Sequence, residues 1–206
     1  MRKISDSTVR RLAFYLRFLE QSAAQQVTTI SSAELARRGG TTSAQVRKDL
    51  SFFGSFGKRG LGYSVSELTA RIREILGLKR PHRVVLVGAG KMGGALLHYR
   101  GFRQHGFDVV AIYDKDPRKI GTRADGLMVR DVRQLEADLK KEPPDIAILV
   151  TPAEAAQEVT DRLVRAGVKA ILNFAPVSLA VPTDVAVQSV NMALELETLS
   201  YALANR

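Results

Sequence analysis

The sequence predicts an α/β protein in which a small helical domain precedes a doubly wound domain with a parallel sheet. Apolar residues recur at helical spacing through residues 1–80. From residue 83 onward, short apolar runs alternate with amphipathic segments, as in a parallel sheet with crossover helices. Gly77 and the stretch KRPH, residues 79–82, mark a boundary between these patterns. The predicted domains are residues 1–80 and 81–190, with a terminal helical segment over residues 191–206.

Two different signals predict the first two helices of the N-terminal domain. Apolar residues spaced three and four apart define one face of a helix over residues 7–21. Ser31 and Glu34 have the spacing of a capping box, which predicts a helix over residues 32–38. The following Gly39-Gly40 is a turn signal, so this helix is expected to end there.

A third helix, over residues 43–52, completes a predicted helix-turn-helix, because the short glycine turn joins it to the second helix. Val46, Leu50 and Phe53 can face the core together, which leaves a polar face outward. Glutamine and arginine side chains suit the reading of adenine and guanine edges in the major groove. The candidate DNA-binding residues of this helix are Ser43, Gln45, Arg47, Lys48 and Ser51. A solvated helix face is the alternative.

The segment from Phe52 to Val65 holds four glycines around two adjacent cations and predicts a β-hairpin with a basic tip. Attached to a helix-turn-helix, such a hairpin forms a wing. Its Lys58 and Arg59 would reach phosphates or a narrow minor groove. The alternative is a surface hairpin with incidental charges. A closing helix is predicted over residues 66–78.

The positive charge of the chain is concentrated in the N-terminal domain. Residues 1–80 hold 15 Lys and Arg and 6 Asp and Glu, a net +9, whereas the remaining residues hold 16 and 15, a net +1. An excess of cations beside a helix-turn-helix indicates a polyanion partner, and double-stranded DNA fits best. A merely solvated basic surface is the alternative.

The second domain opens with VVLVGAGKMGGALL, residues 84–97, which predicts a strand buried on both faces, a glycine loop and a helix. Gly88 permits the tight turn, Gly90 lets a pyrophosphate approach, and Gly93 lets the helix pack close to the strand. Asp114 ends the next apolar run, 21 residues after Gly93, where a carboxylate meets the ribose hydroxyls of NAD(H). The candidate cofactor-binding residues are Gly88, Ala89, Gly90, Lys91, Met92, Gly93 and Asp114. This pattern predicts a Rossmann dinucleotide site, against a glycine-rich turn that binds nothing.

Five strands are predicted in this domain, over residues 83–87, 108–113, 127–130, 145–150 and 169–172. Ligands in such sheets bind beyond the carboxyl ends of the strands. The loops that begin at Thr151 and Asn173 are therefore placed to line the site, although ordinary turns are an equal alternative. A leucine stripe predicts a terminal helix over residues 192–204, and the simple interpretation packs it against its own domain.

The composition argues against several classes of protein. The chain has no cysteine, which excludes disulfides, thiolate metal ligands and thiol chemistry, and no metal-ligand spacing occurs. No apolar run approaches the ~20 residues that span a membrane. The first residues also lack the apolar stretch of a secretory signal, so we expect a cytoplasmic protein with no membrane or metal partner.

The rival class is an NAD-dependent oxidoreductase with an accessory basic domain. It would need a substrate domain and a positioned acid or base, but only a terminal helix follows the last predicted strand. His82, His98 and His105 are expected at the surface, in a linker, at the end of the glycine-loop helix and in the next loop. A nucleoid-type DNA binder whose second domain only dimerises is a third class, which the complete glycine loop and Asp114 disfavour.

The stretch SSAELARRGGTTSAQVRKDLSFFGSFGKRGLGYSVSEL closely resembles the winged-helix half of the Rex family of bacterial redox-sensing repressors. The resemblance continues through the glycine loop into YDKDPRKIG, TPAEAAQ and NFAP, so it covers nearly the whole chain. It implies a homodimeric repressor of palindromic operators, not an enzyme, with NAD(H) as effector and NADH as the releasing form. It also implies a domain-swapped C-terminal helix.

The same resemblance implies roles for individual residues. The contacts that it implies on the nicotinamide side are Thr151, Pro152, Asn173, Phe174 and Pro176. At the dimer interface, Asn191 stands where the family commonly has aspartate, with Arg17 and Tyr99 as candidate partners in a switch. If the family's carboxylate forms an ion pair there, Asn191 makes a neutral hydrogen bond instead.

Overall fold

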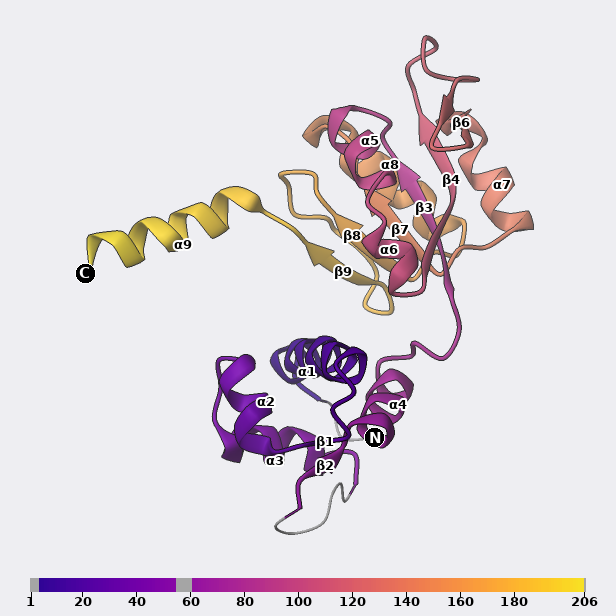
Figure 1. Ribbon diagram of the computed structural model, residues 1–206. Coiled ribbons are helices and arrows are strands. Elements are labelled where there is room, and N and C mark those ends of the chain that lie inside the picture. Colours follow the sequence, from indigo (N-terminus) through magenta and orange to yellow (C-terminus); the bar gives the residue numbers. More distant parts are fainter. Residues whose placement is uncertain (1–3, 55–60, 206) are drawn as a thin grey trace. The chain divides into compact units, whose positions relative to one another are not determined.

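The structure is a computed structural model that describes residues 4–54 and 61–205 (Figure 1). The chain divides into two compact units, Met1–Arg80 and Pro81–Arg206. Each unit has its own apolar core. In the described part of the chain, no helix is long and apolar enough to cross a membrane.

In its described residues, 4–54 and 61–80, the first unit has four helices and one short antiparallel strand pair. The helices are α1 (Asp6–Ala24), α2 (Ser32–Arg38), α3 (Ser43–Ser51) and α4 (Val65–Ile75), and the strands are β1 (Thr29–Ile30) and β2 (Tyr63–Ser64). All four predicted helices are confirmed, with ends shifted by up to three residues. Leu12, Val46 and Ile72, from three of them, are fully buried in the shared core.

Each of the two predicted capping boxes forms only one of its two hydrogen bonds. Ser31 and Thr42 each accept a hydrogen bond at 3.1 Å, from the backbone N–H groups of Glu34 and Gln45. The reciprocal bonds of a capping box are replaced, because Glu34 pairs with Arg38 and Gln45 donates to a buried aspartate one turn later. The serine and threonine caps alone therefore fix where α2 and α3 begin.

The predicted wing is only partly described. Phe52 and Phe53 form a turn at the end of α3 and do not start a strand, so the first arm of the predicted hairpin is wrong there. β2 instead pairs with β1, which places Tyr63 opposite Ile30. The predicted tip, with Lys58 and Arg59, lies outside the described residues.

The second unit contains a seven-stranded sheet in the order β5-β6-β4-β3-β7-β8-β9. The strands are β3 (His82–Val87), β4 (Phe107–Asp114), β5 (Arg123–Ala124), β6 (Leu127–Asp131), β7 (Ile146–Leu149), β8 (Ala170–Asn173) and β9 (Ala186–Ser189). All neighbours are parallel except β5 and β6. The five predicted strands are confirmed. The sequence did not predict β5, which has two residues, or β9, an edge strand with mostly exposed side chains.

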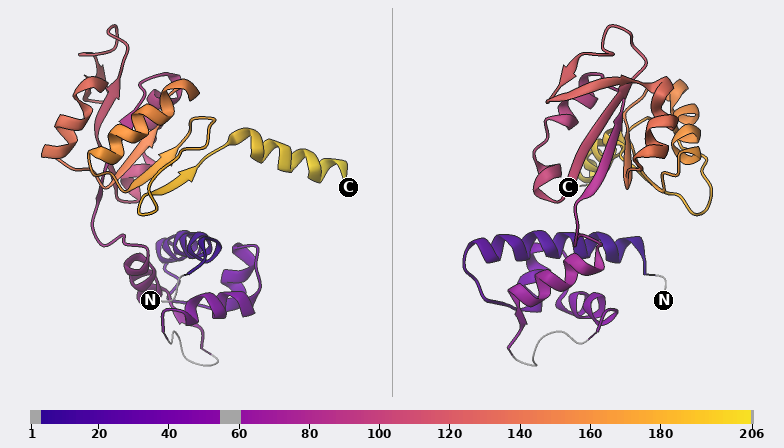
Figure 2. Two further views of the ribbon diagram at one scale, coloured as in Figure 1. Left: turned by 180° about the vertical axis from the view of Figure 1, so that it is seen from behind. Right: turned by 90° about the vertical axis from the view of Figure 1, so that its right-hand side faces the viewer.

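Helices cover both faces of this sheet (Figure 2). On one face lie α5 (Lys91–Leu97) and α6 (Gly101–Gln104), and on the other lie α7 (Leu135–Lys141), preceded by the 3₁₀ turn η1 (Val132–Gln134), and α8 (Ala153–Arg165). Val84 and Leu86 pack on the first face, whereas Val85 and Val87 pack on the second. The apolar run of β3 is continuous because both of its faces are buried.

The terminal helix α9 (Met192–Ala204) has the predicted bounds but buries none of its residues. Leu196 and Leu203 are both 68% exposed. The expectation that α9 packs against its own domain is therefore wrong. Exchange of this helix between subunits stays a prediction.

Candidate dinucleotide site and nucleic-acid interface

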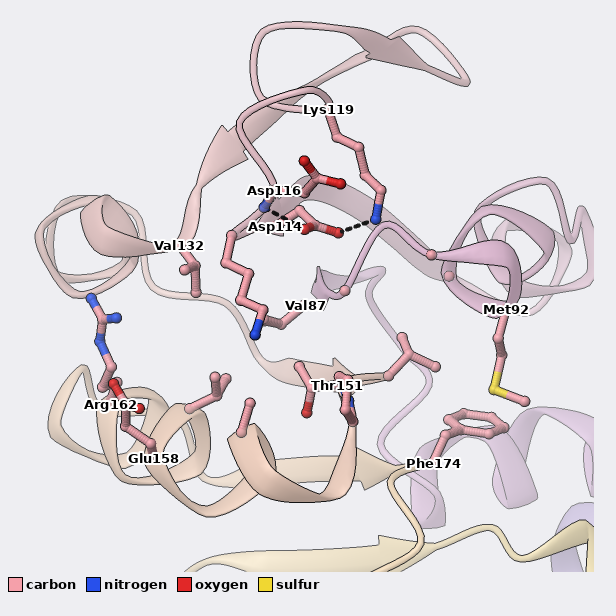
Figure 3. Close-up of a pocket in the computed structure, with 18 of the residues that line it drawn as sticks. Val87, Met92, Asp114, Asp116, Lys119, Val132, Thr151, Glu158, Arg162 and Phe174 are labelled. Carbon is pink, nitrogen blue, oxygen red and sulfur yellow. Dashed lines mark hydrogen bonds and ion pairs between the residues drawn. The ribbon is translucent and has the colours of Figure 1, made fainter.

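A cavity of about 850 Å³ lies at the carboxyl ends of the central strands of the second unit (Figure 3). The chain leaves β3 for β4 on one side and returns to β7 on the other, so the strand order reverses beside β3. Such a switch point is where doubly wound sheets bind ligands. The predicted residues that line the cavity are Gly88, Gly90, Lys91, Met92, Gly93, Asp114, Thr151, Pro152 and Phe174.

Three glycines shape the phosphate end of the cavity. Gly88 has a φ of 112°, and a Cβ there would lie 2.5 Å from the carbonyl oxygen of Val150. A Cβ on Gly93 would overlap the carbonyl oxygen of Gly88, so glycine is what allows α5 to pack against the turn. A Cβ on Gly90 would meet no protein atom within 4 Å, so the space beside its backbone is open to a ligand.

Asp114 ends β4 beside this loop and is 8% exposed. Its carboxylate accepts hydrogen bonds from the N–H groups of Ala89 at 2.7 Å and Asp116 at 2.8 Å, and pairs with Lys119 at 3.1 Å. Burial alone would raise the pKa of Asp114, but the two N–H groups and the Lys119 ammonium hold it below its ordinary value. Asp114 is therefore a charged acceptor at neutral pH.

The other cations after β4 differ in their availability to a ligand. Arg118 folds back on Asp116 at 3.0 Å, and this guanidinium lowers the pKa of Asp116 to about 2. Lys115 and Lys119 both line the cavity, and Lys119 is paired with Asp114. The ribose end of the cavity thus presents two charged carboxylates, of which Asp116 is paired with Arg118 and Asp114 is flanked by lysines.

Two predicted nicotinamide-side residues do not line the cavity. Asn173 is fully buried, donates to the carbonyl groups of Ala175 at 3.2 Å and Val177 at 2.9 Å, and accepts from the N–H of Ala175 at 2.9 Å. Its amide is used up in shaping the loop that follows β8. Pro176 is exposed and lies outside the lining, so direct contact of Asn173 and Pro176 with the nicotinamide stays a prediction. Ala89, another predicted cofactor contact, is also outside the lining, and its backbone N–H donates a hydrogen bond to Asp114.

The sequence did not predict the far half of the cavity. Figure 3 shows Val132, Glu158 and Arg162 at the end away from Met92 and Phe174. Val132 directly follows β6. Because ligands bind beyond the carboxyl ends of the strands, the same rule that placed the loops at Thr151 and Asn173 could have found it. Glu158 and Arg162 lie in the second and third turns of α8, where no local motif marks them.

The residues present fit a dinucleotide. The hydroxyl of Thr151 is buried and has no hydrogen-bond partner among the described residues, so a polar ligand group would satisfy it. The open space at Gly90 and the charged Asp114 suit a diphosphate and a ribose diol, respectively.

Asp114→Ala is expected to weaken NADH binding by about tenfold and to narrow the preference for NADH over NADPH. The carboxylate would accept from the ribose hydroxyls and repel a 2′-phosphate, and alanine does neither. Titrations of both nucleotides measured by their fluorescence test this. Unchanged affinities for both would remove Asp114 from the site.

The polar face of α3 carries exposed Arg47, Lys48 and Ser51, with Ser43 half-exposed. Arg47 donates to the hydroxyl of Ser32 at 3.1 Å, which joins α3 to the start of α2. Gln45 differs from the prediction, because its side chain is half-buried and its amide donates to Asp49 at 2.7 Å. The outward face of α3 is therefore mainly basic, with Gln45 held at its edge.

Each residue of the predicted switch has its own local surroundings. Arg17 is exposed on α1, and Tyr99 is 53% exposed, with its ring edge-to-face on Phe102 at 5.1 Å. Asn191 caps α9, and its side-chain oxygen accepts from the N–H groups of Ala193 at 3.0 Å and Leu194 at 3.4 Å. A neutral amide is sufficient for this cap.

The three histidines form no common site. His82 is the first residue of β3, stacked on Phe107 at 5.6 Å, and not part of a linker as predicted. His98 ends α5, with its ring 2.7 Å from the carbonyl oxygen of Gly94, and His105 ends α6. Within residues 4–54 and 61–205, no group of three or more His, Asp or Glu side chains could hold a metal ion.

Known proteins resemble both units. Residues 3–51 match a family described as "Putative DNA-binding protein N-terminus", and residues 79–177 match one described as "CoA binding domain". A redox-sensing transcriptional repressor Rex from Carboxydothermus hydrogenoformans is 47% identical over 199 residues, which is 97% of this chain and 96% of the relative. The chain belongs to the Rex family.

Solved Rex structures share the whole fold. The Rex-family repressor RSP, in complex with β-NAD⁺ and operator DNA, is 40% identical with a TM-score of 0.94, over 100% of this chain and 94% of that one. RSP in complex with β-NADH is 39% identical with a TM-score of 0.90, over 100% and 96%. The predicted family and fold class are confirmed, and the relatives are named as transcriptional repressors and not as enzymes.

Proposed function

We propose that this Rex-family chain is a transcriptional repressor that senses the NADH/NAD⁺ ratio and leaves palindromic operators when NADH binds. One observation carries the proposal: a helix-turn-helix with a basic outward face and a dinucleotide cavity at a sheet switch point occur in one chain. The complexes of RSP with β-NAD⁺ and operator DNA and with β-NADH support the same pair of ligands here.

The cavity favours NAD(H) over coenzyme A, although residues 79–177 match a family described as binding CoA. Both ligands carry an adenosine diphosphate group, which the open space beside Gly90 suits. Coenzyme A also carries a phosphate on the adenosine ribose. The charged and nearly buried Asp114 would repel that phosphate and would accept from the free hydroxyls of NAD(H).

The proposed mechanism is allosteric. The redox state of the nicotinamide is the signal, and no bond is made or broken in the protein. Thr151, Met92 and Phe174 would contact the nicotinamide side, while the glycine loop and Asp114 hold the rest of the molecule. NADH can release DNA only if it binds one form of the repressor more tightly than the form that fits the operator.

On the DNA side, α3 would enter the major groove with Ser43, Arg47, Lys48 and Ser51, and with Gln45 at the edge of this face. Lys58 and Arg59 stay predicted contacts to phosphates or the minor groove. Since both proposed ligands are cytoplasmic in bacteria, we place the repressor in the cytoplasm.

We further propose a homodimer. Two-fold dimers read palindromic operators with one recognition helix per half-site. Residues 191–206 would form the dimerisation segment, because α9 leaves its leucines in water in the single chain. In a dimer a second copy would cover them, and Arg17, Tyr99 and Asn191 would lie at that interface.

The experiment measures binding of the full chain to a palindromic operator with A·T-rich flanks, at fixed salt, with NAD⁺, NADH or coenzyme A added. We expect tight binding with NAD⁺, a loss of about tenfold or more with NADH, and no effect of coenzyme A. Equal affinity with NAD⁺ and NADH would refute the sensor. Steady oxidation of NADH with a small carbonyl substrate would instead support the oxidoreductase alternative.

A further inference from the structure

The recognition helix α3 contains a fully buried carboxylate that the proposed DNA contacts do not use. Asp49 follows the exposed Lys48, yet its side chain is 0% exposed. It lies one helical turn after Gln45 and faces the core together with Val46 and Leu50. A buried charge is costly unless it is paired and hydrogen-bonded, so the partners of Asp49 must be accounted for.

Four hydrogen bonds converge on the Asp49 carboxylate. Arg11 of α1 donates to both oxygens, through Nε at 2.6 Å and Nη2 at 2.7 Å. The Tyr15 hydroxyl, one turn further along α1, donates at 3.0 Å, and the Gln45 amide donates at 2.7 Å. Arg11 is itself held by the hydroxyl of Thr8 at 3.1 Å. The carboxylate thus joins two side chains on one face of α1 to α3.

These hydrogen bonds constrain the orientation of α3 in a way that apolar packing does not. Two parallel hydrogen bonds between a guanidinium and a carboxylate fix both the distance and the orientation of the two groups. Leu and Val side chains in the same core tolerate small rotations of a helix about its axis, but the Arg11–Asp49 pair does not. The rotation of α3 determines where Arg47 and Lys48 point.

Asp49 also orients the side chain of Gln45, one of the predicted base-contacting residues. Because Asp49 holds one N–H of the Gln45 amide, the free oxygen and the second N–H of that amide have a set orientation. Reading an adenine edge requires one donor and one acceptor in a fixed geometry.

We propose that Asp49, held by Arg11 and Tyr15, is a positioning residue for operator recognition, which sets the rotation of α3 and the orientation of the Gln45 amide. This inference rests on the proposed DNA-binding function and deepens it. Asp49 touches no base, so its removal lowers the preference for the operator more than it lowers binding to DNA in general.

A purely structural ion pair would behave differently. Replacing a buried pair by apolar residues of similar size is often neutral or stabilising for the fold. If Asp49 serves stability alone, such a replacement leaves the preference for the operator intact.

The test compares four full-length variants with the wild type: Asp49→Asn, Arg11→Met, the double variant Arg11→Met with Asp49→Leu, and Arg10→Met as the matched control. Arg10 is exposed on the same helix and carries the same charge as Arg11. The measurements are the affinities for the operator and for a scrambled duplex of equal length at one salt concentration, and the thermal unfolding midpoint of each variant.

We expect the ratio of the two affinities to fall by about tenfold in Asp49→Asn and in the double variant, and to stay unchanged in Arg10→Met. Arg11→Met leaves a charged Asp49 buried and can unfold the first unit, so the double variant, which removes both charges together, decides the outcome. A wild-type ratio in the folded double variant would overturn the inference. A wild-type protein without preference for the operator would instead refute the proposed function.

Discussion

Replacing Gly93 by alanine is expected to weaken dinucleotide binding strongly and to leave a DNA-binding protein that no longer responds to NADH concentrations that release the wild type. The new Cβ would overlap the carbonyl oxygen of Gly88 and lie 3.3 Å from the side chain of Leu86. The overlapping oxygen belongs to the backbone and cannot rotate away, so either the turn at Gly88 or the start of α5 must move. Overpacking of this kind costs about 1–3 kcal/mol.

Because the displaced groups themselves form the phosphate end of the cavity, affinity for NADH should fall by about 100-fold or more. The matched control is Gly94→Ala, one residue further along α5, where a Cβ would meet nothing within 4 Å. That control should bind NADH as the wild type does. The readouts are NADH titration by fluorescence and operator binding with and without NADH. Wild-type NADH affinity in Gly93→Ala would contradict the assigned role of the glycine loop.

The sequence predicted those parts of the fold whose signals are local. The strand, glycine loop and helix over residues 84–97 were predicted because each requirement, from burial on both faces to close packing at Gly93, falls on neighbouring residues. The starts of α2 and α3 were predicted for the same reason, since Ser31 and Thr42 lie three residues from the N–H groups they accept from.

The parts that the sequence did not predict depend on contacts between distant segments. Asp49 looks like one charge among several on a polar helix, and its burial follows from Arg11, 38 residues earlier. Asn173 follows a strand at a ligand-binding edge, but its amide bonds to its own loop at Ala175 and Val177. β9 is recognisable only from its pairing with β8, because an exposed edge strand lacks an apolar pattern.

Placing glutamate at Leu196 and Leu203 is expected to prevent dimerisation and to lower operator affinity by about 100-fold or more, since each half-site would then be bound independently. The two leucines lie seven residues apart on one face of α9, with Leu199 between them, and are each 68% exposed in the single chain. A continuous apolar stripe left in water marks an interaction surface. Two buried carboxylates at its centre would make that interface unfavourable.

The control places the same two charges, again seven residues apart, at Thr198 and Asn205, away from the stripe. Both variants gain equal repulsion from the DNA, so any difference between them reports the interface and not the charge. Sedimentation equilibrium gives the mass in solution, and operator titration gives the affinity. If the leucine variant stays dimeric and binds the operator as the control does, α9 is not the dimer interface, and its exposed leucines need another partner. If the mass in solution and the operator affinity both fall in the leucine variant, the N-terminal unit reads DNA through two copies that the last helix of the chain holds together.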